Sequence, residues 1–265
     1  MAQIPQEESS PLLWLAIRRS RLVLLLVGVV VVWELYTTTV DVPTYLLPAP
    51  SLIVAQFVDR YELALGAFAI TATEAALGFG LAASTGLLLA VVIARSAILE
   101  DLLYPFLNII RVTPVIAIAP LLTIWFGHGI TPMILVSALI SFFPIVVTTV
   151  LGLRSADPDL VSLMKTLNAS DRVILQKIRF PSALPYLFSS FRISAPLAVI
   201  GALVGEFVGA SAGMGYLLVT ARARIDTEMV FLMVVLSALL GILAFSVIVA
   251  LERRLVRWHH SVWLE

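Results

Sequence analysis

Four ionisable side chains interrupt stretches that are otherwise almost entirely apolar: Glu74, Arg111, Arg192 and Glu206. Because a charge inside a membrane is costly, such groups pair with each other, line a polar cavity or reach the membrane surface. Arg111 and Arg192 lie deep in their stretches, where an arginine either attracts an anionic solute or forms an internal pair, such as Arg192 with Glu74. Glu206 lies near the end of its stretch, so its carboxylate either reaches the surface or faces a path through the protein.

The sequence offers little for metal binding, covalent catalysis or nucleotide hydrolysis. Its 265 residues contain no Cys and only three scattered His, at 128, 259 and 260, which excludes thiolate chemistry and gives no metal-ligand pattern. Neither lysine, Lys165 or Lys177, follows a glycine, so there is no Gly-x-x-x-x-Gly-Lys loop to hold phosphates. We therefore expect no cofactor, no metal and no enzymatic activity on this chain.

The composition indicates that these charges sit in a membrane. Hydrophobic residues make up 60% of the chain and charged residues 13%, against about 45–50% and about 25% in soluble domains. Seventeen basic and seventeen acidic residues cancel, so no excess charge favours nucleic acid. A membrane-crossing helix needs about 20 mostly apolar residues. Six stretches meet that length and predict an all-α integral membrane protein of about six transmembrane helices: Leu22–Val40, Ala64–Ala94, Leu102–Phe126, Ile130–Leu153, Pro185–Phe207 and Met229–Leu251.

The basic residues predict the orientation of these six spans. With the N-terminus inside, the cytoplasmic segments hold twelve Lys and Arg residues and the external segments three, in agreement with the excess of Lys and Arg on cytoplasmic loops. Both termini are then cytoplasmic. The predicted organisation is a cytoplasmic segment at 1–21, a membrane unit at 22–258 and a cytoplasmic tail at 259–265. The first apolar run continues past residue 30 without a small-residue cleavage site, so we expect an uncleaved span.

Prolines punctuate the third and fourth spans, at positions 105, 114, 120, 132 and 144. A proline in a span frees a backbone carbonyl and kinks the helix. Kinked helices are common along transport paths, but they also occur in static bundles. We take Thr113 and Phe143 as further candidates for lining a path.

The longest cytoplasmic connection, Arg154–Leu184, is predicted to have its own structure. The run Asp157-Pro158-Asp159 predicts a short helix extending to about Asn168, and Ser170-Asp171 predicts another that ends before Pro181. One face of the first helix is apolar, because four residues repeat at helical spacing: Leu160, Leu163, Met164 and Leu167. Such a helix either lies on the membrane surface or docks on another protein.

This connection resembles the cytoplasmic motif of the permease subunits of bacterial ABC importers, which reads Glu-Ala-Ala, three residues, Gly, about nine residues and Ile-x-Leu-Pro. Here the corresponding run is Leu163-Met164-Lys165, two residues and Asn168-Ala169-Ser170, closing on Ile178-Arg179-Phe180-Pro181. The opening Glu-Ala-Ala is replaced, and Asn168 stands at the usual Gly. Asn is the residue best able to replace Gly in a left-handed turn, so we expect the turn to be kept.

Further motifs are similar to the nitrate, sulfonate and taurine branch of these permeases, and the resemblance runs from about Trp33 to Trp258. They are Leu47-Pro48-Ala49-Pro50-Ser51, Arg111-Val112-Thr113-Pro114, Ile124-Trp125-Phe126-Gly127, Phe143-Pro144-Ile145, Pro181-Ser182-Ala183-Leu184-Pro185 and Gly213-Met214-Gly215-Tyr216. The run from Gly201 to Phe207 looks closer to permeases for thiamin-precursor pyrimidines and riboflavin. One departure is Glu74, where the branch commonly has a basic residue.

The resemblance implies the type I ABC importer permease fold in a bacterial inner membrane. The implied partners are a second copy of the chain, two ATP-binding subunits that carry MgATP, and an extracytoplasmic solute-binding protein. The loop at 154–181 then couples to the ATPase through Asp157, Pro158, Asp159, Leu160, Leu163, Met164, Lys165, Leu167, Asn168, Ala169 and Ser170. The candidate path residues are Arg111, Thr113, Phe143, Arg192 and Glu206. The alternative is a stand-alone secondary transporter, which would show related halves; the sequence shows no convincing repeat.

Overall fold

The computed structural model describes the backbone of residues 11–256, together with the side chains of residue 21 and of 23–256 except 97, 104, 107, 108, 110 and 111. The predicted tail at 259–265 and the side chain of Arg111 therefore lie outside the described part. Every regular element in the described residues is helical: α1 Pro11–Thr39, α2 Pro50–Asp59, α3 Tyr61–Ala94, α4 Ala97–Val112, α5 Val115–Phe126, α6 Ile130–Arg154, α7 Pro158–Thr166, α8 Asp171–Ile174, a π-helical turn η1 Leu175–Arg179, α9 Phe180–Gly209, α10 Met214–Ala223 and α11 Thr227–Leu255.

Four of these helices are long and apolar enough to cross a membrane: Tyr61–Ala94, Ile130–Arg154, Asp171–Gly209 and Thr227–Leu255. Two shorter stretches, Val23–Thr39 and Val115–Phe126, are also apolar. The prediction of one continuous helix over Leu102–Phe126 is wrong, because α4 ends at Val112 and α5 begins at Val115. Between them Thr113 is extended, with ψ of 124°. Pro114 is the cause, since a proline disfavours helical backbone in the residue before it.

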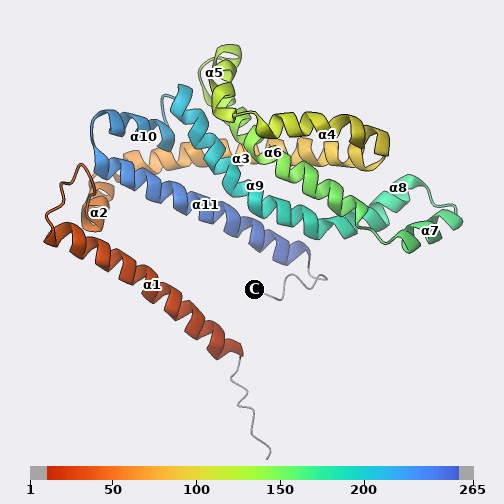
Figure 1. Ribbon diagram of the computed structural model, residues 1–265, viewed down its shortest axis with the longest axis horizontal. Coiled ribbons are helices and arrows are strands. Elements are labelled where there is room, and N and C mark those ends of the chain that lie inside the picture. The colour runs from red at the N-terminus through yellow and green to blue at the C-terminus, as the bar shows by residue number, and fades with distance from the viewer. Residues whose placement is uncertain (1–10, 257–265) are drawn as a thin grey trace, which may run out of the picture.

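The long helices α3, α6, α9 and α11 lie side by side and form the body of the molecule (Figure 1). The short helices α7 and α8 project from one end of this bundle, and α2 and α10 lie at the opposite end (Figure 1). Helices α4 and α5 cover one flank. The two ends of the bundle therefore carry different structures, and each is described below as a candidate site.

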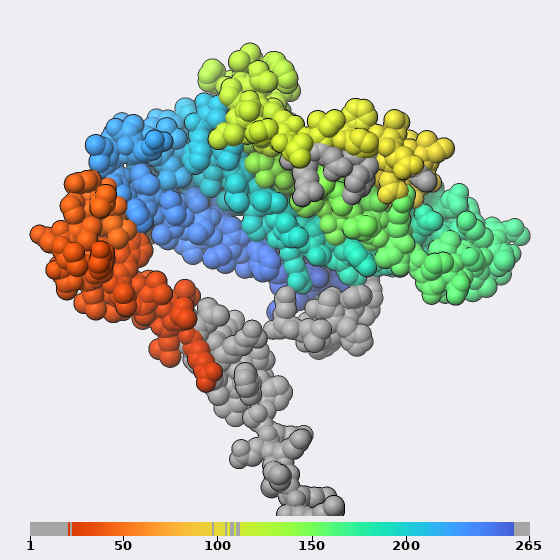
Figure 2. Space-filling view, in the orientation of Figure 1, coloured from red at the N-terminus to blue at the C-terminus, as the bar shows by residue number. Residues whose placement is uncertain are grey.

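Helix α1 stands apart from the bundle over most of its described length (Figure 2). Every described side chain from Val23 to Val32 is exposed. Contact with the remaining helices begins near its end, where the rings of Trp33 and Phe231 lie 5.8 Å apart. The carboxylate of Glu34 also accepts a hydrogen bond from the Ser51 hydroxyl at 2.7 Å. The isolated helix thus leaves a long apolar surface uncovered by its own chain.

Small residues allow α3, α6 and α9 to approach closely. On α3, Gly78, Ala82, Gly86 and Ala90 recur every four residues and are all buried, so they share one face of the helix. A Cβ added to Gly78 would collide with Ser137 of α6. From the other side, a Cβ added to Gly201 of α9 would lie 2.5 Å from the Ser137 Cα. Close backbone approach through small residues is typical of helices packed in membranes.

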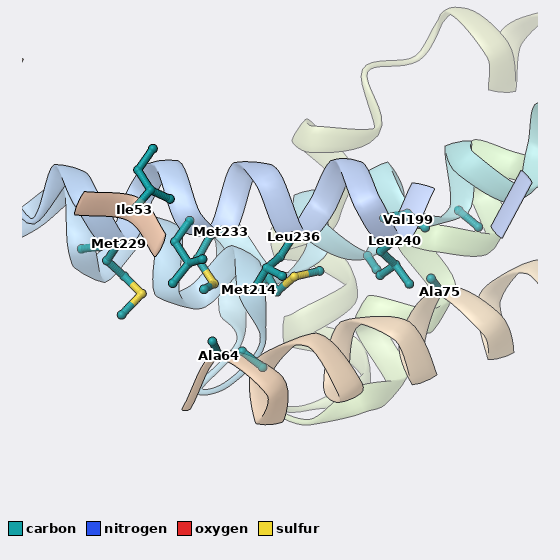
Figure 3. Packing of buried hydrophobic residues seen from close by; sticks show 14 residues of the cluster. Ile53, Ala64, Ala75, Val199, Met214, Met229, Met233, Leu236 and Leu240 are labelled. Atoms are coloured by element: carbon teal, nitrogen blue, oxygen red, sulfur yellow. The ribbon is translucent and has the colours of Figure 1, made fainter. Parts of the chain in front are cut away.

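The end of the bundle that carries α10 has a methionine-rich core. Met214 of α10 and Met229 and Met233 of α11 lie together in it with Leu236, between α11 and the beginning of α3 (Figure 3). Met214 and Met233 are fully buried. Unbranched, flexible methionine side chains fill the irregular space that a short helix leaves between two long ones.

Candidate functional site

Helix α7 begins and turns as the sequence predicts. The Asp157 carboxylate caps it by accepting a hydrogen bond from the Asp159 N–H at 2.8 Å. At its end the Asn168 N–H bonds to the Lys165 carbonyl and the Ala169 N–H to the Met164 carbonyl, both at 3.0 Å. These are the paired hydrogen bonds of a Schellman motif, which needs a left-handed residue after the helix. Asn168 supplies it with φ of 54°, so the predicted turn is confirmed without a glycine.

The leucines of α7 face away from the rest of the chain. Leu160, Leu163 and Leu167 are 49%, 55% and 68% exposed, and no residue of the helix is buried. Val161 and Met164 are half-buried. Figure 2 shows this helix at the far end of the molecule. An apolar patch on a projecting helix is typical of an interaction surface.

The connection from α7 back into the bundle differs from the prediction. The helix that begins after Ser170 does not end before Pro181; α8, η1 and α9 follow one another as one 39-residue helix, Asp171–Gly209. A proline inside an α-helix clashes with the carbonyl four residues earlier. Here the π-helical turn precedes Pro181, and the Phe180 N–H bonds to the Leu175 carbonyl five residues back. This wider turn lets the helix pass through the proline, so α8 and α9 are joined without a break.

The base of the loop is fastened to neighbouring helices. Arg154, the last residue of α6, forms an ion pair with Glu100 of α4. The Arg179 guanidinium donates a hydrogen bond to the Ala94 carbonyl at the end of α3, at 3.4 Å. A Cβ added to Gly152 would lie 2.7 Å from the Tyr186 Cβ, so α6 and α9 are also in close contact there. These contacts hold the root of the projection while the tip remains exposed.

At the opposite end of the bundle, Glu206 forms a buried polar network. Of the two alternatives for Glu206, the one in which its carboxylate reaches the surface is wrong, because the residue is only 2% exposed. It accepts a hydrogen bond from the Thr71 hydroxyl of α3 at 2.6 Å and another from the Gly215 N–H of α10. Thr71 Oγ1 in turn accepts from the Met214 N–H at 2.9 Å. The short connection between α9 and α10 thus folds back over the carboxylate, which explains why the side chain does not reach the surface.

The carboxyl group of Glu74 in α3 lies in hydrogen-bonding contact with that of Glu206. Glu74 is 3% exposed, and its Oε2 atom is buried without a hydrogen-bond partner in the described part of the chain. Glu74 also lines a cleft of about 250 Å³, together with Ile70, His128, Gly129, Ile130 and residues 209–212. The sequence places both acids in spans but gives no indication that they meet.

Arg192 pairs with an acid that the sequence reasoning did not consider. Its Nε lies 2.5 Å from Glu252 Oε2, and the Glu252 side chain is 4% exposed. The alternative of an internal pair for Arg192 is therefore confirmed, but Glu74 as its partner is wrong. Glu252 belongs to α11, one residue beyond the predicted sixth span and beside Arg253 and Arg254, a context that suggests a solvated position. Helix α11 continues to Leu255, and Glu252 is buried within it.

The remaining predicted path residues lie apart from both groups. Thr113 is half-buried at the break between α4 and α5, and its hydroxyl donates to the Ile109 carbonyl at 2.7 Å. Phe143 is partly buried in the apolar cluster around Ala90 and Val146, between α3 and α6. Arg111 belongs to the last turn of α4, with its side chain outside the described part. Among the described residues no group of three or more His, Asp or Glu side chains is placed to hold a metal ion.

Residues 83–257 match the family of binding-protein-dependent transport system inner membrane components. The match covers more than half of the chain, and the protein belongs to this family of multi-pass inner membrane permeases. Its members lack ATPase activity, so this chain is not an enzyme; energy comes from a partner subunit that uses ATP, and a solute-binding protein is the other partner that the family name implies. The resemblance predicted from the sequence is confirmed.

The chain is 38% identical over 230 residues to the formylaminopyrimidine transport permease protein ThiX of Halalkalibacterium halodurans, covering 86% of this chain and 91% of that protein. It is 36% identical over 233 residues to the riboflavin transport system permease protein RibX of Chloroflexus aurantiacus, covering 87% of each. Its fold is similar to that of the MetNI methionine ABC transporter in an inward-facing conformation, with a TM-score of 0.52, 21% identity, and 72% and 94% of the two chains covered.

Proposed function

We propose that this chain is one of two identical permease subunits of an ATP-driven importer, and that the pair forms the path of a small solute. Each copy crosses the membrane six times, through α1, α3, the broken α4–α5 segment, α6, α9 and α11, with both ends in the cytoplasm. Residues 22–258 form the membrane unit, and 1–21 and 259–265 are cytoplasmic. The even number of crossings and the basic residues near α7 support this orientation.

The observation that carries the proposal is the exposed leucine face of α7, which the turn at Asn168 joins to the unbroken helix Asp171–Gly209. Residues 157–170 dock on an ATP-binding subunit, with Leu160, Leu163 and Leu167 in the contact. When two such subunits close around MgATP, each α7 is displaced, and the rigid helix Asp171–Gly209 carries that movement into the membrane. The paired bundles then alternate between inward-open and outward-open states.

The solute comes from an extracytoplasmic solute-binding protein. We propose a thiamin-precursor pyrimidine or riboflavin type of solute rather than a nitrate, sulfonate or taurine type. The names of ThiX and RibX support the first type, as does the motif at Gly201–Phe207. Of the path residues predicted from the sequence, Arg111 and Thr113 at the α4–α5 break keep that proposed role. Arg192, by contrast, is held by Glu252, and Phe143 packs between two helices.

Deletion of Ser162–Ser170 tests the coupling proposal. Because this segment forms most of α7 and its C-terminal turn, the variant is expected to insert in the membrane but to lose its ATPase during affinity purification. The point variant Leu163→Asp is expected to lose most of the ATPase as well, since a charge replaces an apolar contact. The matched control is Leu46→Asp, which changes a leucine that is 67% exposed at the other end of the molecule and retains the ATPase.

Recovery of the ATPase at normal yield with the deletion variant would contradict the coupling proposal. Uptake that persists when the ATPase is absent would instead support the secondary-transporter alternative. The two measurements separate the location of the coupling surface from the source of energy.

A further inference from the structure

The strongest unexplained feature of the chain is the free carboxyl oxygen of Glu74. Glu74 is only 3% exposed, and its Oε2 atom has no hydrogen-bond partner among the described residues. Leaving a buried polar atom without a partner is unfavourable, so each such atom in a folded protein needs a reason. Glu74 lines the cleft of about 250 Å³ between α3 and the turns before α6 and α10, so a bound molecule can supply the missing partner.

The chemistry of the cleft limits what that molecule is. Glu206, behind Glu74, already accepts from the Thr71 hydroxyl and the Gly215 N–H. Because both Glu206 oxygens already accept these hydrogen bonds, the proton in the hydrogen bond between the two carboxyl groups comes from Glu74. The free oxygen of Glu74 is then a hydrogen-bond acceptor on an acidic pair. It suits an N–H donor of a neutral or cationic solute and repels a sulfonate or nitrate group.

The other cleft residues agree with a small, partly apolar solute. Ile70 and Ile130 provide apolar walls, and residues 209–212 line the cleft as well. His128 is exposed and lines the same cleft, in the Gly127-His128-Gly129 turn, where its ring is open to an incoming molecule. A second cleft of about 260 Å³ shares Ile70, Ser211 and Ala212 with the first and contains Tyr216. Together the two clefts flank the turn that leads from α9 to α10.

We propose that Glu74 contacts the solute and selects it: its free carboxyl oxygen accepts a hydrogen bond from an amino or imino group of a neutral or cationic nitrogen heterocycle, and the acidic pair excludes oxyanions. This inference rests on the proposed importer function and narrows its solute class. The site lies at the end of the bundle opposite α7, where a solute enters before it crosses.

The test is direct binding to the purified permease–ATPase complex in detergent, without the solute-binding protein, so that only the permease selects. Equilibrium dialysis uses radiolabelled formylaminopyrimidine and riboflavin as donor-bearing probes, and butanesulfonate and nitrate as anions. Glu74→Leu removes the acceptor and is expected to weaken binding of the donor-bearing probe at least about 10-fold. Glu74→Gln donates its amide N–H to Glu206 and keeps a carbonyl oxygen for the solute, so its binding is expected to stay within about threefold of wild type.

Two further variants keep the test decisive. Thr73→Val changes the exposed neighbour, whose hydroxyl donates to the Ala69 carbonyl, and is expected to bind like wild type. Ala212→Leu narrows the cleft without touching the acidic pair and is expected to weaken binding as Glu74→Leu does. The yield of co-purified ATPase reports whether each variant is folded.

Wild-type binding of the donor-bearing probe by Ala212→Leu, or by a Glu74→Leu variant that assembles normally, overturns the proposal. So does a wild-type complex that binds neither donor-bearing probe, or that binds butanesulfonate or nitrate more tightly than both. Failure of the importer proposal is seen separately, as uptake into proteoliposomes that continues when the ATPase is inactivated.

Discussion

At the scale of single residues, Glu206 anchors the connection between α9 and α10 through hydrogen bonds. Its carboxylate accepts hydrogen bonds from the Thr71 hydroxyl and the Gly215 N–H, so α3, α9 and the beginning of α10 meet at one buried acid. Gly213 lies directly against that carboxyl group and has φ of +103°. Both the conformation and the space at this position therefore require glycine.

Replacing Gly213 with Ala is expected to destabilise the protein, because the added Cβ overlaps the Glu206 carboxyl group and the backbone conformation is unfavourable for alanine. An unfavourable backbone conformation alone costs about 1–3 kcal/mol. The melting temperature of the purified permease, followed by tryptophan fluorescence, is the measurement. Gly80→Ala is the matched control, since a Cβ there meets nothing within 4 Å; equal melting temperatures for the two variants would contradict the role given to Gly213.

The sequence predicted the type of these buried groups but not their partners. Glu206 and Arg192 stand out because acids and bases are rare in apolar stretches, and that signal is local. Thr71 lies 135 residues from Glu206 along the chain, and Glu252 lies 60 residues from Arg192. Hydropathy indicates which segment of the chain a residue belongs to, but not which way its side chain faces. The partners of a buried charge on another helix can therefore be identified only from the packed structure.

At the scale of elements, α7 was predictable because its signals are contiguous. Asp157 and Pro158 mark the beginning, the leucine spacing gives the exposed face, and Asn168 marks the turn. The continuity of α8 with α9 was not predictable, because Pro181 ordinarily signals an interruption and a π-helical turn has no simple sequence signature. The same residue type had opposite outcomes at Pro114, which breaks the predicted third span, and at Pro181, which does not.

The turn after α7 is expected to tolerate Asn168→Gly and not Asn168→Val. Glycine adopts the left-handed conformation freely, whereas a β-branched residue with positive φ is strongly disfavoured, at a cost of about 1–2 kcal/mol. No residue of α7 is buried, so tertiary packing does little to compensate, and Asn168→Val is expected to lower the yield of co-purified ATPase several-fold. Thr73→Val, an exposed change on α3 outside the loop, serves as the control. Full assembly of Asn168→Val would show that the turn does not set the docking geometry.

At the scale of the whole molecule, arginines of the loops lie in two groups, one at each end of the bundle. Arg95, Arg154 and Arg179 lie at the end that carries α7, whereas Arg60 and Arg222 lie at the end that carries α2 and α10 (Figure 1). The sequence predicted this division from loop charges alone, and the fold places the two sets on opposite sides. Helix α1 was predicted as a span of the bundle, yet it contacts the other helices mainly near Trp33. Hydropathy measures affinity for a membrane and carries no information on contact with other helices.

The proposed orientation predicts which end of the bundle is accessible from outside the cell. The natural sequence contains no Cys, so single-cysteine variants give an unambiguous label. Ser211→Cys, exposed in the turn before α10, is expected to react with a membrane-impermeant maleimide in right-side-out spheroplasts. Ser162→Cys, exposed on α7, is expected to react only in inverted vesicles, with the permease expressed without its ATPase so that the site is uncovered. Because the Lys and Arg residues concentrate at the α7 end, labelling of Ser162→Cys from outside would reverse the topology and remove α7 from the reach of any cytoplasmic ATPase.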